Sequence, residues 1–298
     1  MTMDAAPPAG TAALLILADS RLPAGGHAHS GGLEPAVAAG RLSTVDDLGV
    51  FLRGRLRTSG LVAAALAAAA CRHARAETVS AGADATTAAA GQSPPSRAGA
   101  PPEPGAAVPV PGAAVPVPGA AVPVPGAAVP VPGAVGHRAS ADGADFWAAL
   151  DAEADARTPA PALRLASRQQ GRALLRAGRS AWTSPGLDRL AASPGGPHHS
   201  VALGVVGAAA GCDPVGVARV AAYLSVSGPA SAAVRLRGFD PLAVHAVLVG
   251  LAADVDRIGA EAAEAARGPL PDLPSAAAPL LDVLAETHAR TEVRLFAS

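Results

Sequence analysis

Residues 44–76 read TVDDLGVFLRGRLRTSGLVAAALAAAACRHARA, and this stretch decides the fold class. Thr44 followed by two acidic residues is typical of a helix N-terminus, where such side chains satisfy free backbone N–H groups. Leucine then recurs at every fourth position from Leu48 to Leu56, which places one apolar stripe along a helix. The Ala-rich run that follows predicts that this helix continues to about Ala76, weakened by two glycines on the way.

The same helical spacing recurs along most of the chain, and no stretch alternates β-branched with polar residues as a half-buried strand does. Half of the 298 residues are apolar but only 2% are aromatic, so the interior must be built from small aliphatic side chains. The sequence therefore predicts an all-α fold, a single compact helical domain of about 8–10 helices. The ranges expected to be helical are 12–18, 45–76, 142–156, 162–179, 198–211, 214–227, 231–237, 241–266 and 276–292.

A low-complexity segment interrupts this pattern. The heptapeptide Gly-Ala-Ala-Val-Pro-Val-Pro occurs four times in succession over residues 105–132, within a Pro/Ala/Gly-rich stretch that extends over residues 78–141. Proline at two of every seven positions excludes a helix. We expect a long disordered insertion at 78–141, which divides the helical domain into residues 1–77 and residues 142–298. A solvated tether is the simpler interpretation, and a ligand for a proline-binding groove is the alternative.

Several classes of function are excluded or disfavoured by composition. The chain contains no Lys, so it has neither the lysine of a phosphate-binding P-loop nor that of a Schiff-base enzyme. Its net charge of -1 gives no general attraction to nucleic acid or to an anionic membrane. The apolar runs are too short to span a bilayer, no basic start of a secretory signal is present, and the only two cysteines lie in apolar runs. We therefore expect a cytoplasmic protein without nucleic-acid or membrane partners.

The loop at residues 22–34, LPAGGHAHSGGLE, holds the only candidates for a metal site. His27 and His29 form an H-x-H pair, and imidazole suits nickel. Two ligands are too few for a closed site, so both remain weak candidates unless a partner or a second copy supplies a third. No set of residues has the spacing of a catalytic site, and the sequence predicts that the chain is not an enzyme and holds no cofactor tightly.

A stripe of arginines marks the predicted helix at 162–179. Arg164, Arg168, Arg172 and Arg176 recur at every fourth position, opposite an apolar face. A solvated face is the simpler interpretation, and an acidic protein partner is the alternative.

The segment from Ala18 to Glu34 closely resembles the N-terminal signature of the urease accessory protein UreF family. The residues that carry this resemblance are Asp19, Ser20, Pro23, Gly25, Gly26, Ser30, Gly32, Leu33 and Glu34. Further similarity follows in the same order at residues 164–175, 198–236 and 294–298, so that it covers the chain apart from the Pro-rich insertion.

This resemblance implies a helical homodimer that acts as a scaffold for nickel insertion into apo-urease. UreF-like proteins bind UreD, also called UreH, and modulate the GTPase UreG, while nickel passes through the complex in transit. The residue matches imply that Glu34 and Arg235 lie close together on a surface facing UreG. They imply likewise that the tail residues Arg294, Leu295 and Phe296 dock UreD.

Two departures from the family pattern stand out. His27 and His29 occupy positions where the family usually has aromatic residues. After Leu236, residues 237–241 replace the Pro-Leu-Gly-Gln sequence that the family tends to have, so the resemblance does not extend to the partner surface or metal route near this turn. The alternatives to the scaffold are a metal-dependent enzyme that uses the His27 and His29 loop, and a general adaptor that works through the Pro-rich tether.

Overall fold

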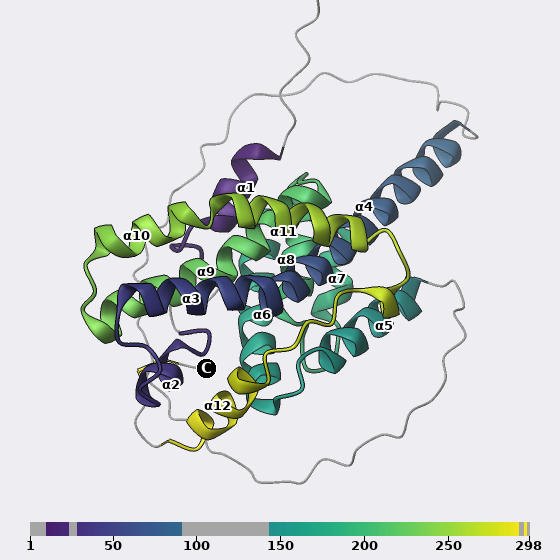
Figure 1. The fold of residues 1–298 in the computed structure, drawn as a ribbon. Coiled ribbons are helices and arrows are strands. Elements are labelled where there is room, and N and C mark those ends of the chain that lie inside the picture. Colours follow the sequence, from purple (N-terminus) through teal and green to yellow (C-terminus); the bar gives the residue numbers. More distant parts are fainter. Residues whose placement is uncertain (1–9, 24–28, 91–142, 292–294, 297–298) are drawn as a thin grey trace, which may run out of the picture.

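The computed structural model describes residues 10–23, 29–90, 143–291 and 295–296, and every regular element in these ranges is helical (Figure 1). The all-α prediction is therefore confirmed. The elements are α1 (Thr11–Ala18), α2 (Leu33–Ala38), α3 (Val45–Arg55), the π-helical turn η2 (Leu56–Gly60), α4 (Leu61–Ala90), α5 (Gly143–Ala156), α6 (Pro161–Ala181), α7 (Pro185–Ala191), α8 (His199–Ala209), α9 (Pro214–Arg237), α10 (Pro241–Gly250), α11 (Ala252–Ala265), the 3-10 turn η3 (Leu270–Asp272) and α12 (Pro279–Ala289).

The core lies where α4 packs against α8, α9 and α11. Figure 1 shows α3 leading almost directly into α4, which runs through the body of the molecule. Helix α8 is buried on nearly all sides, from Ser200 to Gly207. A Cβ on Gly204 would lie 2.4 Å from the carbonyl oxygen of Ala67 and 2.5 Å from the Cβ of Ala70. Small side chains thus allow α8 and α4 to approach at backbone contact, as the aromatic-poor composition predicts.

The start of α3 has the predicted cap. The hydroxyl of Thr44 accepts the backbone N–H of Asp47 at 3.1 Å, and the Asp47 carboxylate accepts the backbone N–H of Thr44 at 2.9 Å. This reciprocal pair is a capping box, which satisfies free N–H groups of the helix and fixes where it begins.

Helix α9 corrects the sequence prediction, which ended one helix at 227 and began another at 231. Pro229 lies inside a single continuous helix. Proline has no N–H to donate to the carbonyl of Ser225 four residues earlier. Arg55 supplies the missing donor, because its Nε lies 2.9 Å from that oxygen. A side chain 170 positions away therefore lets the helix tolerate its proline.

Other differences concern element boundaries. The range 241–266 was expected to be one helix, but α10 and α11 are separated at Leu251, directly after Gly250. The break lets α10 contact α3 while α11 packs on α4 and α9. The described residues contain twelve α-helices instead of about 8–10, since the short α2 and α7 were not expected.

The Pro-rich insertion falls largely on residues 91–142, which lie outside the described residues. Helix α4 extends to Ala90, past residue 78 where the insertion was expected to begin. Within the part of the chain that the structure covers, none of the helices combines the length and apolarity needed to cross a membrane.

Candidate functional site

The candidate site is built around Glu34, in the first turn of α2. Gly31 and Gly32 precede the helix with φ angles of 59° and 86°, the left-handed region that glycine adopts most readily. The Ser30 hydroxyl accepts the Glu34 backbone N–H at 3.2 Å, and Leu33 is fully buried. These features of the signature stretch hold the Glu34 carboxylate beside α12, which packs against α2 (Figure 1).

The Glu34 carboxylate binds the C-terminal tail through two backbone hydrogen bonds. Leu295 N–H donates to Oε1 and Phe296 N–H donates to Oε2, both at 2.9 Å. The Glu34 side chain is only 14% exposed, so these charge-assisted bonds are largely shielded from water. The two tail side chains point to different environments: Phe296 is 7% exposed, whereas Leu295 is 75% exposed.

Two further side chains complete the site. His288 of α12 is buried, and its Nε2 lies 3.2 Å from Glu34 Oε2 and 3.3 Å from the Phe296 carbonyl oxygen. The guanidinium of Arg235, near the end of α9, lies 5.0 Å from the centre of the Phe296 ring. This distance is typical of a cation–π contact. Glu34 and Arg235 thus meet at Phe296, although they lie far apart in the sequence.

Sequence reasoning found four of the described residues in this cluster but missed His288. No local pattern identifies His288, because its partners come from α2 and the tail. Arg294 lies outside the described residues, as do Gly25, Gly26 and His27. The roles predicted for these four residues stay predictions.

The rest of the signature loop is described in part. Asp19 accepts hydrogen bonds from the Arg21 backbone at 2.8 Å and from its guanidinium at 2.6 to 3.1 Å. The side-chain bond to Arg21 is the main reason that the pKa of Asp19 falls to about 2. Ser20 and Pro23 are exposed beside this turn. The described residues contain no cluster of three or more His, Cys, Asp or Glu side chains that would hold a metal ion.

A cavity of about 710 Å³ lies beside the signature loop. Its walls come from α1, α3, α4, α6, α8, α9 and the segment before α12, and they include Asp19, His29, Arg55, His199 and Arg235. Burial, together with the nearby His29, lowers the pKa of His199 to about 4, so its imidazole is neutral at physiological pH.

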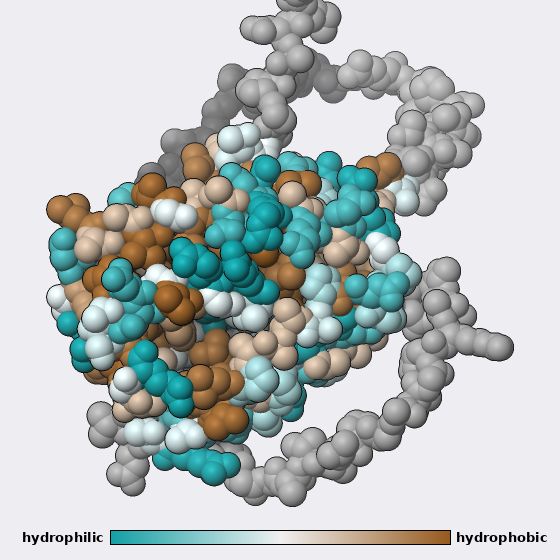
Figure 2. Space-filling model, in the orientation of Figure 1, coloured by the Kyte–Doolittle hydropathy of each residue, from teal (hydrophilic) through white to brown (hydrophobic). Residues whose placement is uncertain are grey.

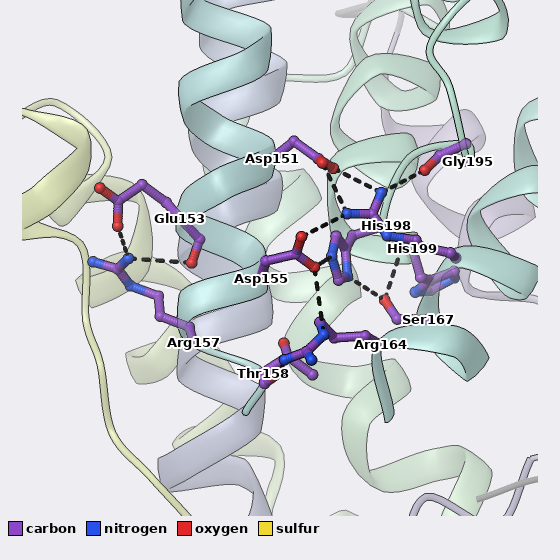
Figure 3. A network of polar contacts seen from close by, with 12 residues as sticks. Asp151, Glu153, Asp155, Arg157, Thr158, Arg164, Ser167, Gly195, His198 and His199 are labelled. Atoms are coloured by element: carbon purple, nitrogen blue, oxygen red, sulfur yellow. Dashed lines mark hydrogen bonds and ion pairs between the residues drawn. The ribbon is translucent and has the colours of Figure 1, made fainter. Parts of the chain in front are cut away.

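A second polar network joins α5, α6 and α8 (Figure 3). His198 Nε2 lies 2.9 Å from Asp155 Oδ1, and His198 Nδ1 lies 3.0 Å from the Ser167 hydroxyl oxygen. Burial lowers the pKa of His198, which the bond to Asp155 only partly offsets, so neutral His198 donates to Asp155 and accepts from Ser167. The contacts follow the order of a Ser–His–Asp triad. However, the Ser167 oxygen also accepts the His199 backbone N–H at 3.1 Å, which makes it a cap for α8.

The arginine stripe on α6 belongs mostly to this internal network. Arg168 binds Asp151 and Asp155 with contacts of 2.8 to 3.1 Å and also donates to the carbonyl of Gly196. Arg164 donates to the carbonyls that precede α6, and Arg172 donates to the Gly195 carbonyl. Much of the stripe therefore holds α5 and the loop before α8 in place, a third use that the sequence did not suggest.

In the part of the chain that the structure describes, the helical core and the polar site that binds residues 295–296 define a helical protein. The UreF family model matches residues 128–252. The urease accessory protein UreF of Mycobacterium sp. (strain JLS) is 39% identical over 285 residues, 96% of this chain and 97% of its own length. The UreF protein of Mycolicibacterium vanbaalenii is 37% identical over 287 residues, which cover 96% of this chain and 98% of the relative. The UreF protein of Mycobacterium tuberculosis (strain H37Rv) is 34% identical over 287 residues, with the same coverage of both chains. The chain belongs to the UreF family of urease accessory proteins.

Membership of this family supports a role in urease maturation and shows that the chain is not an enzyme. The alternative of a metal-dependent enzyme built on His27 and His29 is therefore wrong. The resemblance stated from the signature residues is confirmed along nearly the whole chain.

Proposed function

We propose that this chain is a scaffold for nickel insertion into apo-urease, which binds UreD (UreH) through its tail and modulates the GTPase UreG through Glu34 and Arg235. The observation that carries this proposal is the convergence of these residues on Phe296. Glu34 holds the tail backbone, and Arg235 covers the Phe296 ring. One small region thus contains all the described residues for which the family resemblance implies a partner.

Two exposed side chains of the site support separate contacts with the two partners, UreD and UreG. Leu295 presents an apolar side chain to solvent, which suits an anchor for a UreD surface. Arg235 is also exposed, and its fixed position beside Phe296 suits recognition of an acidic group on UreG. Arg294 is assigned to the UreD contact by the resemblance alone.

The proposal includes a homodimer in the cytoplasm, with nickel passing through the assembly as cargo. Figure 2 shows apolar side chains gathered over the end of the molecule that α10 forms and over α12. Leu242 and Val249 on α10 and Val283 on α12 are among the most exposed large apolar residues. Such surface supports association with other polypeptides, a second copy included.

Co-purification with UreD and UreG, singly and together, tests the proposal. We expect Arg235→Glu to keep the wild-type circular dichroism spectrum but to lower UreG retention and urease activation by about tenfold or more, because a reversed charge repels an acidic partner group. Arg237→Glu is the matched control, since Arg237 is exposed two residues further along α9. Retention of UreG by Arg235→Glu at the wild-type level would contradict the assignment.

The adaptor alternative is separated by deletion of residues 105–132. The scaffold proposal expects near wild-type activation after this deletion, since the folded site carries recognition. Loss of partner capture in the deletion variant, with an unchanged melting temperature, would favour the Pro-rich tether as the binding element.

A further inference from the structure

Arg55, the last residue of α3, carries a guanidinium group that the fold uses only in part. Its Nε donates to the Ser225 carbonyl, which Pro229 leaves without a helical partner. Among the described residues, no carboxylate lies within ion-pair distance of Arg55, and its two Nη atoms make no hydrogen bond. A guanidinium has five N–H donors in a planar fork, so most of its binding capacity remains unused.

The surroundings make this unpaired charge unusual. Arg55 lines the cavity of about 710 Å³, and burial lowers its pKa to about 10. Arg157, another arginine that lines this cavity, has Glu153 as its ion-pair partner. Charges that are withdrawn from water are costly unless they are paired, so a half-buried guanidinium without an ion-pair partner indicates a place where an anion binds.

The signature stretch contributes one wall around Arg55. Gly31 has a φ of 59°, and a Cβ on this residue would lie 3.1 Å from Arg55 Cζ and 3.2 Å from Nε. Glycine therefore leaves the face of the guanidinium uncrowded. The π-helical turn η2 begins directly after Arg55, and such turns often occur at functional sites.

The other charged groups at the cavity do not cancel the positive charge of Arg55. Arg235 adds a second cation to the lining. Of the two carboxylates there, Asp19 is already paired with Arg21, and burial raises the pKa of Asp282. The Ser227 hydroxyl supplies a further donor in the same walls.

We propose that this cavity binds a small oxyanion, a phosphate or carboxylate group, with Arg55 as its principal ligand. The site goes beyond the scaffold role, because it gives the free chain a small-molecule ligand of its own. The two Nη atoms offer a bidentate contact that matches the geometry of either oxyanion.

A double variant separates ligand binding from the structural role of Arg55. Arg55→Gln alone removes the donor to Ser225, but Pro229→Ala restores a backbone N–H that reaches the same carbonyl. The combination Arg55→Gln with Pro229→Ala therefore keeps the hydrogen bond of α9 while it removes the guanidinium. Pro229→Ala alone is one control, and Arg53→Gln, which changes an exposed arginine of the same helix, is the other.

Binding is measured by isothermal titration with inorganic phosphate and with acetate, and by melting temperature against sodium chloride at equal ionic strength. We expect saturable binding of at least one of these ions by the wild type and both controls, and about tenfold to a hundredfold weaker binding by the double variant. A wild type that binds neither ion, or a double variant that binds as well as the wild type, would overturn the proposal. A response to phosphate alone or to acetate alone identifies which oxyanion chemistry the site prefers.

Discussion

The helical core and the tail site of this protein are held together by different kinds of contact. Where α4 meets α8, the contacts are apolar and so close that only glycine fits at Gly204. At the tail site, the Glu34 carboxylate, a buried imidazole and the Arg235 guanidinium surround two residues of the C-terminus. Close packing depends on shape and tolerates little change, whereas polar contacts of this kind can be reproduced by another polypeptide. The recognition that we propose for the tail site therefore lies in a different part of the chain from the packing that stabilises the core.

The largest effect is expected in the core. Gly204→Val places a branched side chain against the backbone of α4, because even a Cβ would lie 2.4 Å from the Ala67 carbonyl oxygen. Helices packed at backbone contact cannot absorb this volume without separating. We expect the free energy of unfolding to fall by about 3 kcal/mol or more, measured by urea denaturation.

A glycine outside the core provides the matched control. Gly54 lies in α3 and has no atom within 4 Å of the position that a Cβ would take. Gly54→Ala should raise the free energy of unfolding by about 0.5 to 1 kcal/mol, since alanine favours the helix and restricts the unfolded chain. Similar destabilisation by both substitutions would show that close packing does not distinguish the core.

An intermediate effect is expected at the boundary between the two regions, where His199 opens α8 and lines the cavity. The folded pKa of about 4 lies below the usual 6.5, so the unfolded chain takes up the proton first as pH falls. Neutral His199 makes its full contribution to the free energy of unfolding above pH 6.5, and this contribution is lost as pH falls toward 4. From pH 7 to pH 5, His199 alone should lower the free energy of unfolding by about 2 kcal/mol.

His199→Gln should remove this part of the acid sensitivity, measured by denaturation at a series of pH values. His245→Gln is the control, because His245 is exposed on α10. The remaining slope in His199→Gln is attributed to other groups, including His198, whose pKa burial also lowers. Equal pH profiles for the wild type and His199→Gln would show that His199 is not held in its neutral form.

Much of the fold was predictable because local patterns determine it. Leucine spacing and the Thr44 cap identified α3, and apolar periodicity identified most other helices. The continuity of α9 was not predictable, since it depends on Arg55 donating to a carbonyl 170 positions away. Local rules treat Pro229 as a breaker, and only the tertiary contact reverses that rule.

The candidate site, like the fold, could be predicted from the sequence only in part. Glu34, Arg235 and the tail were found by their resemblance to a family signature, and their proximity is now visible at Phe296. His288 and Arg55 carry no signature that a single sequence can reveal. Their importance comes from burial and from partners on distant elements, which periodicity does not encode.

The smallest destabilisation is expected at the tail site, and it sharpens the contrast with the core. Glu34→Ala removes both acceptors for the tail, so the backbone N–H groups of Leu295 and Phe296 lose their partners. Because the tail can then bond to water, the free energy of unfolding should fall by only about 1 to 2 kcal/mol. Hydrogen exchange followed by NMR should nevertheless show both amides unprotected, while the amides of α8 keep their protection. Persistent protection at Leu295 and Phe296 in Glu34→Ala would mean that Arg235 and His288 hold the tail without the carboxylate, and that the site is as strongly determined by packing as the core.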